Sequence, residues 1–248
     1  MTACIIQARM GSTRLPGKIL KMLAGKPMLW HVVVRCRKAT KVDRVIVATT
    51  TNPEDDAVEA FCVENGIECF RGSSDDVLER YHGAAKEAGA DTVVRVTSDC
   101  PLIDPTVIDL FIGAFETQSV DYVSNIIPGH RSFPRGLDVE VFGFAPLETA
   151  AAEATEPYEK EHATPYIWEN RKGAFRIGQA VPVPPDLSRG HRLTVDYPED
   201  FALIERIYVE LYRPGSIIDT VQALAFLDKH PEVASLNASC EQKPVKPS

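Results

Sequence analysis

The chain has 248 residues, of which 44% are hydrophobic, so it can bury a sizeable core. Its formal net charge is -8, from 27 basic and 35 acidic residues, whereas a nucleic-acid-binding protein usually has a basic surplus or a basic stripe. Charged residues interrupt the apolar run at the N-terminus, and no other run reaches the length of a membrane span, so we expect a cytoplasmic protein with no nucleic-acid or membrane partner.

Short apolar runs alternate with helix signals along the first half of the chain. Residues 3–6, 44–49 and 92–96 have the apolar, often β-branched character of strands that are buried on both faces of a parallel sheet. Asn52-Pro53 and Asp104-Pro105 each place a cap residue and a first-turn proline before a periodic apolar stretch, which predicts helices. The pattern predicts an α/β fold whose mostly parallel sheet has helices on both faces and ligands beyond the carboxyl ends of its strands.

The loop after the first predicted strand, QARMGSTRLPGK at residues 7–18, carries the strongest functional signal. Its glycines let backbone N–H groups approach phosphate oxygens, and Arg9, Arg14 and Lys18 supply the cations that a triphosphate needs. The spacing of the two glycines and the residue after Lys18 both differ from the Walker and dinucleotide-binding motifs. The loop therefore indicates a third kind of phosphate site, with a solvated basic turn as the alternative.

Residues 70–81 follow a predicted edge strand and open a helix. This segment contains four residues that are suited to frame a base or a ribose: Arg71, Gly72, Ser73 and Arg80. A plainly capped helix is the alternative interpretation.

Asp99 comes just after the predicted strand at residues 92–96. Mg²⁺ in proteins is commonly held by one or two carboxylates and by phosphate oxygens of the substrate, so Asp99 is a candidate metal ligand. A carboxylate that only caps a turn is the alternative.

The middle of the chain, at about residues 125–145, is first interrupted by glycine and proline, and its residues then alternate between apolar and acidic. This pattern predicts an inserted loop and an added strand that is suited to a dimer contact. Asp138 and Glu140 lie on one face of that alternation, where they bind sugar hydroxyls or face solvent. Arg131 or Arg135 is a candidate partner for an acceptor carboxylate, with surface exposure as the default. His162 is a candidate sugar contact, with a structural histidine as the alternative.

Asp196 follows a short predicted strand, Leu193–Val195, and precedes a predicted helix, so it is a second candidate metal ligand. A helix N-cap is the alternative, since aspartate is a favoured cap. We expect one domain over residues 1–235 and a disordered tail over residues 236–248, which are rich in Ser, Asn, Pro and Lys.

Several motifs together resemble one family across residues 2–212. The chain is similar to the spore-coat polysaccharide biosynthesis protein F group, homologues of CMP-3-deoxy-manno-octulosonate synthetase within the acylneuraminate cytidylyltransferases. The motifs that carry this resemblance are IIQARMGSTRLPGK, FRGSSDDVLERY, TSDCPLID, GLDVEVF, EKEHATPYI and TVDYPEDF.

The resemblance implies a Rossmann-like nucleotidyltransferase fold, CTP as a substrate, Mg²⁺ as a cofactor and a homodimer. It also assigns the metal to Asp99 and Asp196. The nucleotide is assigned to two groups of residues, the first in the triphosphate loop and the second near the cytidine: Gln7, Ala8, Arg9, Gly11, Ser12, Arg14 and Lys18, and then Arg71, Gly72, Ser73 and Arg80.

The expected function is therefore the transfer of CMP from CTP to a 2-keto sugar acid in surface polysaccharide or glycoconjugate biosynthesis, with release of pyrophosphate. Two alternatives remain open. One is a sugar-1-phosphate nucleotidyltransferase that uses another nucleoside triphosphate. The other is a nucleotide-binding homologue without catalysis.

Overall fold

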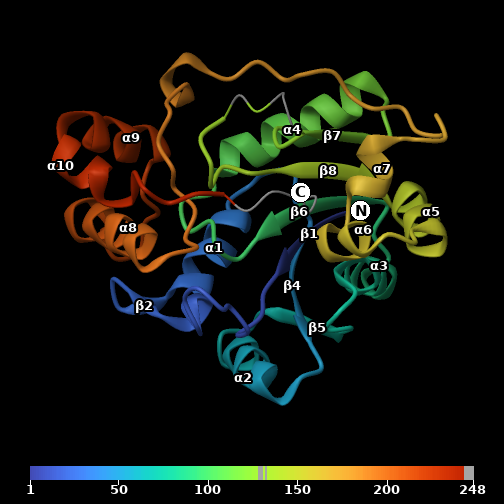
Figure 1. Ribbon diagram of the computed structural model, residues 1–248, viewed down its shortest axis with the longest axis horizontal. Coiled ribbons are helices and arrows are strands. Elements are labelled where there is room, and N and C mark those ends of the chain that lie inside the picture. The colour runs from blue at the N-terminus through green and yellow to red at the C-terminus, as the bar shows by residue number, and fades with distance from the viewer. Residues whose placement is uncertain (128–130, 132, 243–248) are drawn as a thin grey trace.

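A six-stranded sheet in the order β5-β4-β1-β6-β8-β7 forms the centre of the molecule (Figure 1). The computed structural model describes residues 1–127, 131 and 133–242. Only β8 runs against its neighbours in this sheet, and a separate two-stranded ribbon pairs β2 with β3. The strands are β1 (Thr2–Gln7), β2 (Met22–Leu23), β3 (Lys26–Pro27), β4 (Arg44–Thr50), β5 (Glu68–Gly72), β6 (Thr92–Thr97), β7 (Tyr122–Ser124) and β8 (Glu140–Gly143).

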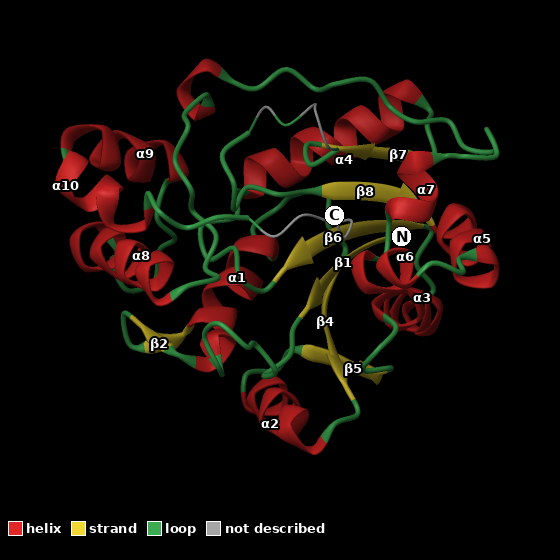
Figure 2. Ribbon diagram, in the orientation of Figure 1, coloured by secondary structure: helices red, strands yellow, loops and turns green. Residues whose placement is uncertain are grey.

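Helices connect the strands and cover the sheet (Figure 2). The α-helices are α1 (Met28–Cys36), α2 (Asp56–Glu64), α3 (Val77–Ala88), α4 (Pro105–Gln118), α5 (Phe144–Glu153), α6 (Pro157–His162), α7 (Pro165–Glu169), α8 (Pro198–Leu211), α9 (Thr220–Lys229) and α10 (Pro231–Ala234). Short 3₁₀ helices are η1 (Lys18–Leu20), η2 (Pro53–Asp55), η3 (Pro185–Leu187) and η4 (Ser235–Asn237). No helix in the described ranges combines the length and the apolar character that a membrane crossing requires.

The two faces of the sheet pack into separate hydrophobic cores. Because successive side chains of a strand point to opposite faces, Cys4 and Ile6 of β1 join one core, while Ala3 and Ile5 join the other. The first core includes side chains of α1, α2, α4, α8 and α9, and the second includes those of α3, α5 and α7. Helices on both faces of a mostly parallel sheet confirm the predicted α/β fold.

The predicted strands and helix starts of the first half are confirmed. β1, β4 and β6 pair in parallel with β1 in the middle, and the edge strand β5 precedes α3. Asp104 caps α4 by accepting a hydrogen bond from the backbone N–H of Thr106 at 2.7 Å. Pro53 begins the short helix η2, and α2 follows it directly.

The segment before α8 differs from its prediction. Residues 193–195 form no strand, and the neighbouring Arg192 makes only an isolated bridge to Arg135. The N-cap of α8 is Tyr197, which forms a capping box with Asp200, so the alternative of Asp196 as an N-cap is wrong. Asp196 stays outside the helix, and its carboxylate remains available for other contacts.

The added strand of the middle region is confirmed as β8, which begins at Glu140, and residues 137–139 before it form no strand. The Asn125 side chain donates to the carbonyl of Leu137 at 2.7 Å and accepts from the N–H of Val139 at 2.9 Å. These bonds satisfy the backbone in place of a strand neighbour. Parts of the preceding loop lie outside the described residues.

The C-terminal segment also differs from its prediction over residues 236–242. η4 reaches Asn237, which is buried and donates to Asp200 at 2.8 Å and to the carbonyl of Arg192 at 3.1 Å. Gln242 accepts a hydrogen bond from Arg192 at 2.9 Å. The segment is thus tied to the region before α8, and residues 243–248 lie outside the described residues.

Candidate active site

A cavity of about 610 Å³ opens where β1 and β6 end, at the carboxyl edge of the parallel strands. Ligands of open α/β sheets bind in this position. The cavity brings together most of the residues that the sequence predicts for the site: Gln7, Ala8, Arg9, Gly11, Ser12, Arg14, Lys18, Arg80, Asp99, Asp138, His162 and Asp196.

The loop after β1 folds back so that Lys18 enters the cavity. The backbone N–H of Met10 donates to Asp55 at 2.7 Å, and the N–H of Gly17 donates to the carbonyl of Met10 at 3.2 Å. Gly17 has a φ of 66°, which glycine adopts without steric cost and which turns the chain into η1. The loop is therefore a closed turn with Lys18 at its inner end.

Lys18 joins the two predicted metal ligands. Its Nζ lies 3.0 Å from a carboxylate oxygen of Asp99 and 3.0 Å from one of Asp196. It also donates to the carbonyl of Val195 at 2.6 Å. Segments that are far apart in the chain thus meet at one ammonium group.

The pKa values of this cluster follow from its charges. Burial lowers the pKa of Lys18, but the negative charges of Asp99 and Asp196 raise it by more, so the net shift is upward. Burial raises the pKa of Asp99, but the charge of Lys18 and the hydrogen bonds from Thr97 and Lys18 together lower it by more, so the net shift is downward. The lysine stays protonated and Asp99 stays ionised at neutral pH.

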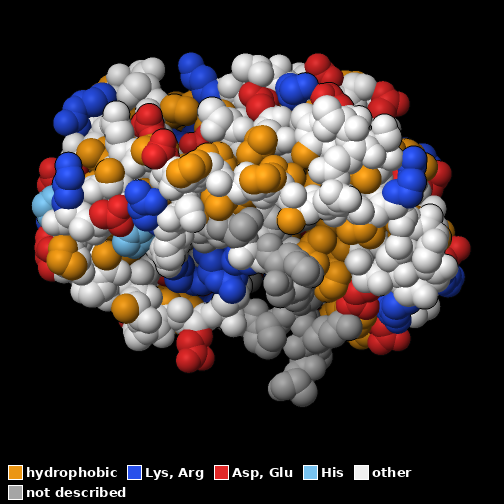
Figure 3. Space-filling model, turned by 90° about the horizontal axis from the view of Figure 1, so that it is seen from above, with side chains coloured by type: hydrophobic (Ala, Val, Ile, Leu, Met, Phe, Trp, Pro, Cys, Tyr) orange, Lys and Arg blue, Asp and Glu red, His pale blue; other side chains and the backbone are white. Residues whose placement is uncertain are grey.

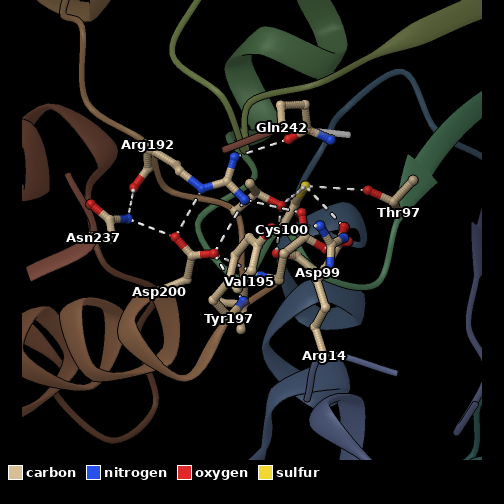
Figure 4. A network of polar contacts seen from close by, with 12 residues as sticks. Arg14, Thr97, Asp99, Cys100, Arg192, Val195, Tyr197, Asp200, Asn237 and Gln242 are labelled. Atoms are coloured by element: carbon tan, nitrogen blue, oxygen red, sulfur yellow. Dashed lines mark hydrogen bonds and ion pairs between the residues drawn. The ribbon is translucent and has the colours of Figure 1, made fainter. Parts of the chain in front are cut away.

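Asp196 is surrounded by cations, two of which, Arg14 and Arg192, are labelled in Figure 4. Besides Lys18, Arg14 lies 3.1 Å from one carboxylate oxygen and Arg192 lies 3.0 Å from the other. The Arg14 guanidinium also lies over the ring of Tyr197, 4.7 Å from its centroid. Arg192 also donates hydrogen bonds to Asp200, so it connects the charge cluster to the first turn of α8.

The donor set of this cluster fits a small hard cation. No group of three or more His, Cys, Asp and Glu side chains that could hold a metal occurs within the described ranges. Asp99 and Asp196 nevertheless place carboxylate oxygens around one positive charge, and the Asp99 side chain is 23% exposed. Mg²⁺ requires only one or two protein carboxylates when substrate phosphates complete its coordination, so the two aspartates are the type of ligand that it requires.

Two arginines leave positive charge in the cavity without a carboxylate partner. Neither Arg9 nor Arg80 forms an ion pair within the described part of the chain, although Arg80 donates to the carbonyl of Ser73. Burial lowers the pKa of Arg80, and the nearby charge of Arg9 lowers it as well. Two cations that repel each other provide a favourable place for an anionic ligand.

Arg80 is the member of the predicted cytidine group that reaches the cavity; Arg71, Gly72 and Ser73 do not line it. Acidic side chains of α2 hold Arg71 instead, since it lies 2.7 Å from both Asp56 and Glu59. The prediction that Arg71 frames the base is therefore not supported by the geometry.

Glu140 is likewise not a cavity residue, and it does not face solvent. It is buried, forms an ion pair with Arg95 and accepts hydrogen bonds from Tyr122 and Thr164. The neighbouring Asp138 does line the cavity, and it pairs with Arg131 at 2.6 Å.

Arg95, which no sequence motif singled out, links this buried network to the cavity. It donates to the side-chain oxygen of Gln7 at 3.0 Å. Because arginine only donates, the amide nitrogen of Gln7 is the part left to meet a ligand. A charged residue in an otherwise apolar strand was the available signal, since a buried charge requires a partner.

Relatives of known sequence resemble the chain along most of its length. A family model described as Cytidylyltransferase matches residues 3–223. The chain is 40% identical over 242 residues to an uncharacterized protein of Methanocaldococcus jannaschii, covering 96% of this chain and 95% of that one. It is 32% identical over 238 residues to the spore coat polysaccharide biosynthesis protein SpsF of Bacillus subtilis, covering 93% and 95%. A 3-deoxy-manno-octulosonate cytidylyltransferase of Geobacter metallireducens is 42% identical over 105 residues, covering 42% and 41%.

Solved structures agree with this result. A cytidylyltransferase from Leptospira borgpetersenii superposes with a TM-score of 0.85 at 32% identity, covering 98% of both chains. A CMP:2-keto-3-deoxy-manno-octonic acid synthetase complexed with CTP has a TM-score of 0.61 at 19% identity, covering 84% of this chain and 98% of that one, and shares the fold. The matched length and the shared fold show that this chain belongs to the cytidylyltransferase family, whose members are nucleotidyltransferases.

Proposed function

We propose that this enzyme transfers CMP from CTP to a hydroxyl group of an acidic sugar and releases pyrophosphate. The observation that carries the proposal is the meeting of Lys18, Asp99 and Asp196 in a cavity at the ends of β1 and β6. The 3-deoxy-manno-octulosonate cytidylyltransferases among its relatives support a 2-keto sugar acid as the acceptor. The SpsF relative supports a role in surface polysaccharide biosynthesis.

In this reaction the acceptor oxygen forms a bond to the α-phosphorus as the bond between that phosphorus and the bridging oxygen to the β-phosphate breaks. The hydroxyl proton is released, and pyrophosphate leaves with the bond electrons. The protein mainly positions the reactants and neutralises charge. Arg9 and Arg80, which form no ion pair with any described residue, are the cations for the triphosphate, while Lys18 and Arg14 line the same cavity.

Mg²⁺ is the cofactor in this proposal, with Asp99 and Asp196 as its protein ligands. Bound there, the ion would neutralise charge on the phosphate oxygens. On the acceptor side, Asp138 and His162 line the cavity and are candidates for contacts to sugar hydroxyls. We also keep the homodimer as a prediction from the family resemblance.

The test is pyrophosphate release across a panel of substrates. The wild-type protein, Mg²⁺ and each of CTP, UTP, GTP and ATP are combined with 3-deoxy-manno-octulosonate, other 2-keto sugar acids and sugar 1-phosphates. We expect release with CTP and a sugar acid, and none from Asp99→Asn under the same conditions. Release with UTP or GTP and a sugar 1-phosphate would instead identify a sugar-1-phosphate nucleotidyltransferase. Tight CTP binding with no release across the whole panel would contradict the proposed reaction.

A further inference from the structure

We propose that a second cavity, next to the candidate active site, binds a carboxylate or phosphate group through Arg135. The cavity has a volume of about 630 Å³ and lies between the loop before β8, the segment before α8 and the C-terminal residues. Five basic side chains line it: Arg131, Arg135, Arg189, His191 and Arg192. Figure 3 shows Lys and Arg side chains gathered near the middle of one face of the molecule.

The backbone brings two of these arginines side by side. Arg135 and Arg192 form a parallel bridge, and the N–H of Leu193 donates to the carbonyl of Arg135 at 2.7 Å. Gly136 permits this approach, since a Cβ there would lie 2.6 Å from the carbonyl carbon of Leu193 and its φ is +97°. The fold therefore places two positive charges side by side, and their repulsion is unfavourable unless anions compensate both of them.

Among the residues that the structure describes, carboxylates form ion pairs with each of these basic groups except Arg135. Arg131 pairs with Asp138, while Arg189 and His191 share Asp228 at 2.9 Å each. Asp196 and Asp200 compensate Arg192.

The Arg135 guanidinium forms no ion pair or hydrogen bond with any described residue. Burial lowers the pKa of Arg135 most, and the charge of Arg131 lowers it as well, while the charge of Asp138 opposes this shift without reversing it. An anion at Arg135 would gain a charge-assisted, fork-shaped contact and would relieve the repulsion between neighbouring arginines.

The two cavities share a wall that contains two ion pairs. Asp138 and Asp196 line the active-site cavity, and their partners Arg131 and Arg192 line the second cavity. The anion has two sources that fit this position: a charged group on the acceptor, or a free inorganic anion. The first source rests on the proposed function, and the second does not.

Arginine modification with mass-spectrometric peptide mapping tests the site directly. Phenylglyoxal reacts with accessible arginine, and the rate at Arg135 is measured in the intact protein alone, with inorganic phosphate, with 3-deoxy-manno-octulosonate, and with CTP and Mg²⁺. At about ten times its dissociation constant, a bound anion should slow the reaction at Arg135 by about tenfold, by mass action. Arg206, an exposed residue of α8 that lines neither cavity, is the matched control and should react at an unchanged rate.

The arms of this experiment separate the possible results. Protection of Arg135 by phosphate alone identifies a free anion as the ligand, and stronger protection by the sugar acid identifies the acceptor. The proposal is overturned if neither anion slows the reaction at Arg135, or if CTP protects it as well as phosphate does. Protection of Arg9 by CTP is read out in the same maps, so a failure of the proposed function is distinguishable from a failure of the second site.

Discussion

At the scale of single residues, Lys18 explains how distant parts of the chain form one site. The basic loop and the two aspartates after short apolar runs were visible in the sequence, so Lys18, Asp99 and Asp196 could all be predicted. The contact of both carboxylates with the Lys18 ammonium group could not be predicted. It depends on the pairing of β1 with β6 in the sheet and on the position of residues 193–196 beside that edge. Arg192 and Tyr197 were missed for the same reason, since their partners are known only from the fold.

Replacing Lys18 tests its role in the reaction. Lys18→Ala removes a cation from the cavity and leaves two carboxylates beside each other, so we expect turnover to fall by about 10²–10³-fold, or about 3–4 kcal/mol in the transition state. The measurement is the rate of pyrophosphate release from CTP with a sugar acid. Lys41→Ala is the control, because Lys41 pairs with Glu116 on the surface, and it should keep the wild-type rate. Unchanged turnover in Lys18→Ala would remove this lysine from the mechanism.

At the scale of elements, hydrophobic patterning and capping predicted the strands and helix starts of the first half. Patterning failed at residues 193–195, where three apolar or β-branched residues form no ladder because the chain runs beside a loop and not beside a strand. It also placed Glu140 on one face with Asp138, where both would bind sugar hydroxyls or face solvent. The antiparallel pairing of β8 with β6 instead sets Glu140 opposite Arg95, a long-range register that the local pattern does not contain.

The buried ion pair between Arg95 of β6 and Glu140 of β8 should stabilise the protein more than an ion pair on the surface does. Glu140→Gln would leave Arg95 buried without its countercharge, so we expect the free energy of unfolding to fall by about 3–5 kcal/mol. Urea unfolding followed by circular dichroism measures this loss. Glu68→Gln is the matched control, because Glu68 pairs with Arg44 on the surface. We expect the control to unfold close to wild type, and equal losses in both variants would contradict the account.

The contact of Asp121 with Arg176 should make stability depend on pH. A hydrogen bond from Arg176 lowers the pKa of Asp121, opposed by burial and reinforced by the backbone N–H and the charge of Arg176. Since the folded pKa lies below the unfolded value of about 3.9, this contribution is present above that pH and is lost as the pH falls through the folded pKa. In urea titrations below about pH 4, Asp121→Asn should therefore lose less stability with falling pH than wild type. Parallel curves for the two proteins would show that this pair contributes nothing.

At the scale of the whole molecule, the alternation of strands and helices was enough to predict the layered α/β fold and the edge where the site lies. The strand order followed from the structure, with β1 at the centre and the antiparallel β8 inserted between β6 and β7. The C-terminal segment looked unstructured by composition, yet Asn237 is buried against the segment before α8. Polar composition cannot reveal a contact whose partners, Arg192 and Asp200, lie far away in sequence.

A crystal structure of the protein with CTP and Mg²⁺ tests most directly whether the cavity at the ends of β1 and β6 binds the nucleotide. We predict density for the triphosphate against the loop of residues 7–18, within contact of Arg9 and Arg80, and a divalent ion coordinated by Asp99. CTP bound in another cavity, or a triphosphate that makes no contact with this loop, would contradict the account.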